Sequence, residues 1–181
     1  DLHPAPPRPS DIDTNEEALK AWKAQASEVH SMNAKLKGAR MEFLQRHAIG
    51  SRYAEYDEVY YPCQFDFRYR HYPIPATAPH WHGPDPSRSM MLFGKSVPVD
   101  ESGLRTLYIQ AANHFGHDKL SFDDRIAWTQ DNLQHIKEWG QNPLDTMHEW
   151  GQAEDPFQFM NTCWALYDPD FASYLPGHID G

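Results

Sequence analysis

Two arginines and a carboxylate alternate within a short aromatic stretch of the sequence. Asp66, Arg68 and Arg70 are separated by single residues in FDFRYR. In a strand the three side chains would share one face, and the two guanidiniums would lie roughly 7 Å apart. That distance is close to the spacing of successive phosphates, and the carboxylate can hold one guanidinium in a bidentate pair. The pattern is compatible with binding to a nucleic-acid backbone. It is equally compatible with a row of alternating charges on a half-exposed strand.

A carboxylate near the end of the sequence is a second candidate for chemistry. Asp180 follows an apolar residue at what reads as a strand end, and the backbone carbonyl of Gly181 is beside it. Metal-assisted phosphoryl chemistry needs two or more carboxylates, and the sequence places no second one next to Asp180. His80 and His82 lack a third ligand in register, which favours an exposed aromatic loop over a zinc site.

The segment that contains the arginines has the composition of strands. Residues 58–75, EVYYPCQFDFRYRHYPIP, are rich in tyrosine, phenylalanine and valine with polar residues interleaved. In such a strand Phe65, Phe67 and Tyr69 face away from the arginines. The glycine and proline content of residues 80–88 predicts a loop after the strands.

A long amphipathic helix is predicted before the strands, over residues 14–48. Thr14 and Glu17 have the spacing of a capping box, and an apolar stripe follows at intervals of three and four: Leu19, Trp22, Ala26, Val29, Met32, Leu36, Ala39 and Phe43. Such a stripe usually packs on one antiparallel partner helix, and no equal partner follows in the sequence. Residues 1–13 contain four prolines and predict an extended connector.

The second half of the chain has helical periodicity. We predict helices over residues 102–115 and 121–140, and a third that has Asp155 as its cap and Pro156 at its first position. Together with the strands, these helices predict an α+β fold that is mostly helical.

Charge and cysteine usage narrow the class of protein. Residues 100–181 hold 14 acidic and 4 basic residues, which accounts for the net charge of -10, so nucleic acid is not expected to cover the whole surface. Cys63 and Cys163 lack metal-type spacing and predict free thiols in a reducing compartment. No run approaches the roughly 20 apolar residues of a membrane helix. The densest basic stretch comprises Lys35, Lys37, Arg40, Arg46, Arg52, Arg68 and Arg70.

Five patches resemble single-subunit, bacteriophage-type DNA-directed RNA polymerases, in the right order. YYPCQFDFRYRHYPIP (60–75) resembles the family's strand with the DxxGR motif, and DIDTNEEALKAWK (11–23) resembles the start of its second long thumb helix. The pattern A-N-x-x-G-x-D-K-x-x-F-x-x-R is complete at 112–125. DPFQFM (155–160) and LPGHIDG (175–181) resemble a further family segment and the entry to palm motif A. Colinear patches are more specific than any one of them.

The resemblance implies a fragment of a right-hand polymerase. It would comprise an extended connector (1–13), the end of a long thumb helix (14–48) and the first part of the palm (49–181), ending after the motif A aspartate. The complete protein is then expected to be a nucleotidyltransferase that makes RNA on a DNA template by a two-metal mechanism with Mg²⁺. The fragment alone is expected to be inactive.

Roles for individual residues also follow from the resemblance. Asp180 corresponds to the motif A aspartate that holds both magnesium ions, and the carbonyl of Gly181 to a backbone ligand beside it. Asp66, Arg68 and Arg70 correspond to the motif that holds the template and the RNA:DNA hybrid, but Tyr69 stands where the family has glycine. The expected partners are the DNA template, the RNA:DNA hybrid and nucleoside triphosphates, with no membrane, for a monomeric enzyme.

Two other readings remain open at this point. A stand-alone nucleic-acid-binding module could use Arg68 and Arg70 without any chemistry, and a small metal hydrolase could be built on His80, His82 and Asp180. The DIDTN start resembles phage members, which predicts the cytoplasm of an infected host cell, with the mitochondrion as the alternative.

Overall fold

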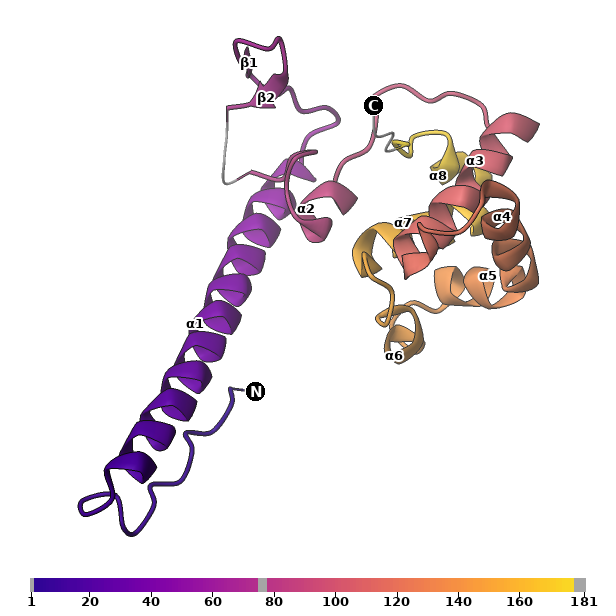
Figure 1. Ribbon diagram of the computed structural model, residues 1–181. Helices are drawn as coiled ribbons and strands as arrows, with labels where there is room; N and C mark the ends of the chain where they lie inside the picture. Colours follow the sequence, from indigo (N-terminus) through magenta and orange to yellow (C-terminus); the bar gives the residue numbers. More distant parts are fainter. Residues whose placement is uncertain (1, 75–77, 178–181) are drawn as a thin grey trace. The chain divides into compact units, whose positions relative to one another are not determined.

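A long helix dominates the N-terminal part of the chain (Figure 1). In the computed structural model, which describes residues 2–74 and 78–177, α1 runs without a break over Glu16–Tyr53. The chain divides into two compact units, residues 1–48 and 49–181. Asp180 and Gly181 lie outside the described residues.

The start of α1 differs from the predicted capping box. Asn15, not Thr14, caps the helix, because its side-chain oxygen accepts a hydrogen bond from the backbone N–H of Ala18 at 3.1 Å. The Thr14 hydroxyl instead donates to the carbonyl of Asp11 at 3.1 Å. Both residues are good cap formers, and the turn at residues 10–14 decides which of them stands at the helix boundary.

The apolar stripe of α1 is only half covered. No residue from Leu19 to Phe43 is buried, and Met32 and Phe43 expose 39% and 37% of their surface. The proline-rich residues form no helix or strand and lie beside α1 (Figure 1). The indole N–H of Trp22 donates to the carbonyl of Pro6 at 3.2 Å, and the Asn33 side chain pairs with the backbone N–H and C=O of His3. This segment therefore covers part of the stripe for which no partner helix was found.

The second unit is mostly helical and adds one small hairpin, which confirms the predicted fold class. Its described elements after α1 are β1 (Cys63–Phe65), β2 (His71–Pro73), α2 (Asp85–Ser89), α3 (Glu101–Ala112), the π-helical turn η1 (Asn113–His117), α4 (Phe122–Asp131), α5 (Leu133–Gln141), α6 (Met147–Trp150), α7 (Pro156–Tyr167) and α8 (Pro169–Ala172). Within the described ranges, no helix is long and apolar enough to cross a membrane.

Helix α7 is the centre of the second unit. It packs against α2, α3, η1, α5, α6 and α8. Residues 158–163 are all buried beneath the neighbouring elements, whereas Phe157 and Trp164 on either side are 38% and 37% exposed. Phe159 and Cys163 from α7 meet Ile136 and Trp139 of α5 and Ala111 of α3 in the core. The approach of α5 is close, since a Cβ on Gly140 would lie 2.8 Å from the carbonyl oxygen of Cys163.

The helix predicted over residues 121–140 is two helices. Ser121 caps α4 as a helix start should, and its hydroxyl accepts from the N–H of Asp124 at 3.2 Å. The helix ends at Asn132, which has φ -100° and ψ 5° and whose side-chain amide donates to the carbonyl of Trp128 at 2.8 Å. Asparagine side chains compete with the backbone in this way, so α5 begins afresh at Leu133.

Candidate nucleic-acid interface

The arginine-bearing segment is a β-hairpin. β1 and β2 are antiparallel neighbours, and their register pairs Cys63 with Pro73, Gln64 with Tyr72 and Phe65 with His71. The prediction that Asp66, Arg68 and Arg70 share one face of a strand is wrong, because all three lie in the loop that joins β1 to β2. The alternation of aromatic and charged residues that is typical of a strand continues through the turn, and so it predicted a strand where the chain forms a loop.

Asp66 organises this loop through backbone contacts. Its Oδ1 accepts hydrogen bonds from the N–H groups of Arg68 at 2.7 Å and Arg70 at 2.9 Å. Its own N–H donates to the carbonyl of Arg70 at 3.0 Å, and its carbonyl accepts from the N–H of Tyr69 at 3.0 Å. Aspartate commonly begins tight turns by binding the backbone two residues on. The carboxylate therefore shapes the loop and does not pair with a guanidinium.

Tyr69 takes the conformation that closes the hairpin. Its φ is 59°, the left-handed region that glycine enters without a penalty and that a residue with a Cβ enters at a cost of about 1 to 2 kcal/mol. A turn followed by one left-handed residue is a common hairpin connection. Tyr69 therefore holds a left-handed conformation, and β1 and β2 on either side of the loop are still paired.

The loop presents cations beside aromatic rings. Phe65, Phe67 and Tyr69 are 68%, 87% and 88% exposed, and the guanidinium carbon of Arg68 lies 5.3 Å from the centre of the Phe67 ring. Among the described residues, neither Arg68 nor Arg70 makes an ion pair. Unpaired guanidiniums bind phosphates, and exposed rings stack on bases or sugars, so this surface has the chemistry of a nucleic-acid contact.

A cluster of rings supports the base of the hairpin. Trp81 stacks on His71 with ring centroids 6.0 Å apart and meets Tyr61 edge-on at 5.8 Å. Tyr72 and His82 also meet edge-on, at 5.2 Å. Burial raises the pKa of the Tyr61 hydroxyl to about 12. The loop of residues 80–82 is therefore a platform for the hairpin.

The histidines of that platform have structural partners. His80 Nδ1 accepts from the N–H of His82 at 3.2 Å, and the N–H of His80 donates to the buried Ser87 hydroxyl at 2.8 Å. No group of three or more potential metal ligands occurs within the ranges that the structure describes. His80 and His82 therefore give no support to the metal-hydrolase reading in the part of the chain that is described.

Asp85 is a key residue that the sequence patterns missed. Its carboxylate accepts from the N–H groups of Phe157 at 2.8 Å and Gln158 at 2.9 Å, and so caps α7 from outside. The predicted cap, Asp155, makes no such bond, and its carboxylate lies 3.7 Å from Arg88. The position of Pro156 at the start of α7 is confirmed. No local signal could reveal a cap supplied from 72 positions away.

The segment that leads toward Asp180 is held by the loop between α2 and α3 and by α3 itself. The backbone N–H groups of Phe93 and Val97 donate to the carbonyls of Tyr174 and Ser173, both at 2.9 Å. At Pro176, two positions after Tyr174, the backbone carbonyl accepts a hydrogen bond from the Gln110 side chain of α3 at 3.3 Å. The second unit thus fixes the chain as far as Pro176.

The known proteins that are similar to this chain agree with one another. Residues 97–181 match the family described as DNA-dependent RNA polymerase. The chain is 35% identical, over 97% of its length, to the mitochondrial DNA-directed RNA polymerase of Neurospora crassa and to the chloroplastic/mitochondrial DNA-directed RNA polymerase 2 of Arabidopsis thaliana. It is 32% identical, over 92% of its length, to the DNA-directed RNA polymerase of Enterobacteria phage T3. The chain is similar to one segment of DNA-directed RNA polymerases from a phage and from organelles.

The chain is short beside its relatives. It spans 13% of the Neurospora crassa protein, 18% of the Arabidopsis thaliana protein and 17% of the phage T3 protein. Phage and organellar relatives match it at similar identities.

Proposed function

We propose that the complete protein containing this segment synthesises RNA on a DNA template. The observation that carries the proposal is the similarity over almost the whole chain to proteins named DNA-directed RNA polymerases. In this proposal α1 belongs to the thumb (14–48), residues 1–13 are the connector before it, and residues 49–181 are the first part of the palm.

The hairpin loop is proposed to hold the template and the RNA:DNA hybrid. Arg68 and Arg70 supply the positive charge, and Asp66 fixes the backbone from which both side chains project. A loop whose shape is fixed by backbone hydrogen bonds presents its guanidiniums with less loss of entropy on binding. Phosphate contacts of this kind position a nucleic acid without reading its sequence.

Magnesium is the metal that the proposed chemistry calls for. Carboxylate and carbonyl oxygens are suitable ligands for Mg²⁺, and the segment would offer those of Asp180 and Gly181. The ranges with described structure contain no cluster of further ligands, so the remaining ones would come from elsewhere in the complete protein. When bound, a pair of such ions supplies activation of a 3′-hydroxyl and stabilisation of the pyrophosphate that leaves.

Replacement of the proposed motif A carboxylate tests the function. In the complete polymerase, Asp180→Asn keeps the size of the side chain but removes its charge, so nucleotide addition should fall by several orders of magnitude. Binding of DNA should persist, because phosphate contacts come from basic residues. A primer-extension assay and a filter-binding assay, run on the same preparations, measure the two effects.

A rate for Asp180→Asn within about tenfold of the parent, which is about 1.4 kcal/mol, would contradict the assignment of this residue. A complete protein that binds a hybrid but adds no nucleotide would favour the second candidate, a nucleic-acid-binding module. The exposed loop with Arg68 and Arg70 is the observation in favour of that candidate.

The finer expectations on partners and location belong to the same proposal. The complete polymerase would act as a monomer on DNA, the RNA:DNA hybrid and nucleoside triphosphates. For a phage gene the site of action is the cytoplasm of the infected host cell, and for an organellar gene it is the mitochondrion.

A further inference from the structure

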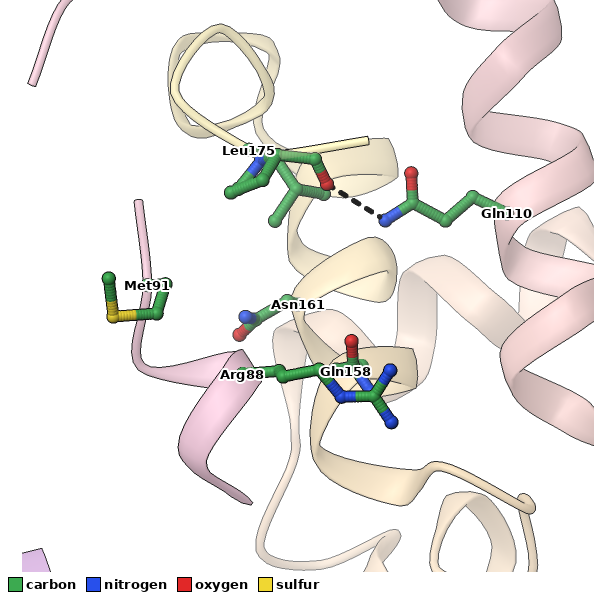
Figure 2. A pocket seen from close by; sticks show the side chains of 7 residues that line it. Arg88, Met91, Gln110, Gln158, Asn161 and Leu175 are labelled. Carbon is green, nitrogen blue, oxygen red and sulfur yellow. Dashed lines mark hydrogen bonds between the residues drawn. The ribbon is translucent and has the colours of Figure 1, made fainter. Parts of the chain in front are cut away.

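A small polar pocket is lined in part by Leu175 and Pro176, a few positions before Asp180 (Figure 2). It is formed by α2, α3 and α7 on one side and by the end of the described chain on the other. The residues that matter are Arg88 of α2, Gln110 of α3, Gln158 and Asn161 of α7, and Leu175 with Pro176.

Gln110 makes the direct link between the helices and the chain. Its side-chain Nε2 donates to the carbonyl of Pro176 at 3.3 Å (Figure 2). Gln110 is half-buried, so water competes less for the bond than it would on the surface. Pro176 precedes Asp180 by four positions, and this is the last hydrogen bond to the chain before Asp180 that the described residues show.

Gln158 lines the same pocket, but the described residues offer no partner for its side-chain amide. The residue is 3% exposed, and neither its Oε1 nor its Nε2 makes a hydrogen bond to the described residues. The Nε of Arg88 is likewise buried without such a bond. Buried polar atoms are normally satisfied, and ordered water is the usual partner where protein groups do not reach.

We propose that Gln110 and Gln158 are positioning residues for the segment that carries Asp180. Gln110 holds the carbonyl of Pro176 directly, and Gln158 acts through a water molecule in the pocket that it shares with Arg88. The proposal rests on the function proposed above, because a metal-binding role for Asp180 requires that its segment be held in a fixed position. A small displacement of a reacting group can slow catalysis by about a hundredfold.

The first test changes the donor at position 110 in the complete polymerase. Gln110→Glu keeps the shape of the side chain, but its carboxylate cannot donate to the Pro176 carbonyl and is repelled by it. The rate of nucleotide addition should fall by about 10- to 100-fold and the Mg²⁺ concentration for half-maximal rate should rise, while hybrid affinity stays at the parental value. A parental rate and a parental Mg²⁺ requirement would overturn the proposal.

A matched control is available in the same unit. Gln152 is exposed, and its Nε2 donates to the carbonyl of His148 at 2.9 Å. Gln152→Glu makes the same chemical change far along the chain from the Asp180 segment and should leave the rate and the Mg²⁺ requirement unchanged. If Gln110→Glu does not fold, Gln110→Met removes the donor without repulsion and decides by the same criterion.

The second test asks whether the Gln158 amide is used. If a water links it to its neighbours, Gln158→Met should lower both the unfolding temperature and the rate of nucleotide addition. If the amide is simply unsatisfied, the apolar replacement of similar shape should raise the unfolding temperature and leave the rate unchanged, which would refute the water-mediated role.

The two proposals fail in different ways. Absence of RNA synthesis by the parent, or an unaffected Asp180→Asn enzyme, would count against the proposed function itself. Loss of activity in Asp180→Asn together with parental behaviour of Gln110→Glu would count only against the positioning role.

Discussion

At the scale of single residues, Tyr69 has the least favourable backbone conformation, because among the described residues it is the one non-glycine residue with a positive φ. Tyr69→Gly removes the Cβ at a φ of 59°, so the hairpin should gain about 0.5 to 1 kcal/mol after the entropy of the unfolded glycine is counted. Slower amide exchange at Ile74, whose N–H donates to the carbonyl of Pro62 at 2.9 Å, would report the gain. Tyr60→Gly is the control, because no left-handed residue stands there and the same change should give no gain.

The loop arginines lead to a prediction about salt. Each guanidinium that binds a phosphate releases about one counterion, so Arg68→Ala and Arg70→Ala should each reduce the slope of log affinity against log salt by about 1. Titration of an RNA:DNA hybrid at several salt concentrations measures the slope. Arg105→Ala is the matched control, since Arg105 pairs with Asp123 at 3.2 Å. Equal slopes for all three variants would argue against a hybrid contact at the loop.

At the scale of elements, the cap that Asp85 gives to α7 joins distant parts of the chain. Asp85→Ala leaves the N–H groups of Phe157 and Gln158 without their acceptor and should destabilise the second unit by about 1 to 2 kcal/mol. Denaturant unfolding of the full chain measures the loss. Asp145→Ala, at an exposed position, should change stability little. A comparable loss in both variants would mean that the cap contributes no more than any surface charge.

The same elements show what sequence patterns could and could not predict. The spacing of the α1 stripe and Pro156 at the start of α7 are local signals, and the helices they predicted are present. The loop at Asp66 was missed because alternating aromatic and charged residues look alike in a strand and in a tight turn. The break at Asn132 depends on the hydrogen bond from its side-chain amide to the carbonyl of Trp128, which the sequence pattern does not reveal.

Non-local relations were beyond the reach of those patterns. The cap from Asp85 to α7 and the bond from Gln110 to Pro176 join residues 72 and 66 positions apart, and only the packed helices bring them together. The roles of Asp66, Arg68, Arg70 and Asp180 rest on resemblance and remain predictions.

At the scale of the whole molecule, the two free cysteines report on integrity. Cys163 is fully buried, and burial raises the pKa of its thiol above the ordinary value of 9.0, whereas Cys63 is only half-buried. A thiol-alkylating reagent should therefore modify Cys63 in the native protein and Cys163 only as the second unit unfolds. Mass spectrometry after timed labelling resolves the two sites. Equal rates at both would contradict the packed core around α7.

The same thiol makes a small contribution to pH dependence. Because the pKa is higher in the folded state, the unfolded chain releases the Cys163 proton first as pH rises. Stability from this group is therefore complete below about pH 9 and declines above it. Cys163→Ser should remove that alkaline loss while leaving a smaller packing defect at every pH.

The central position of α7 also has a consequence for synthesis on the ribosome. α2, α3, η1, α5 and α6 all leave the ribosome before α7, and each of them packs against it. Their apolar faces therefore stay uncovered until Pro156–Tyr167 has emerged, and a nascent chain that pauses before Pro156 presents those faces to chaperones or to other nascent chains.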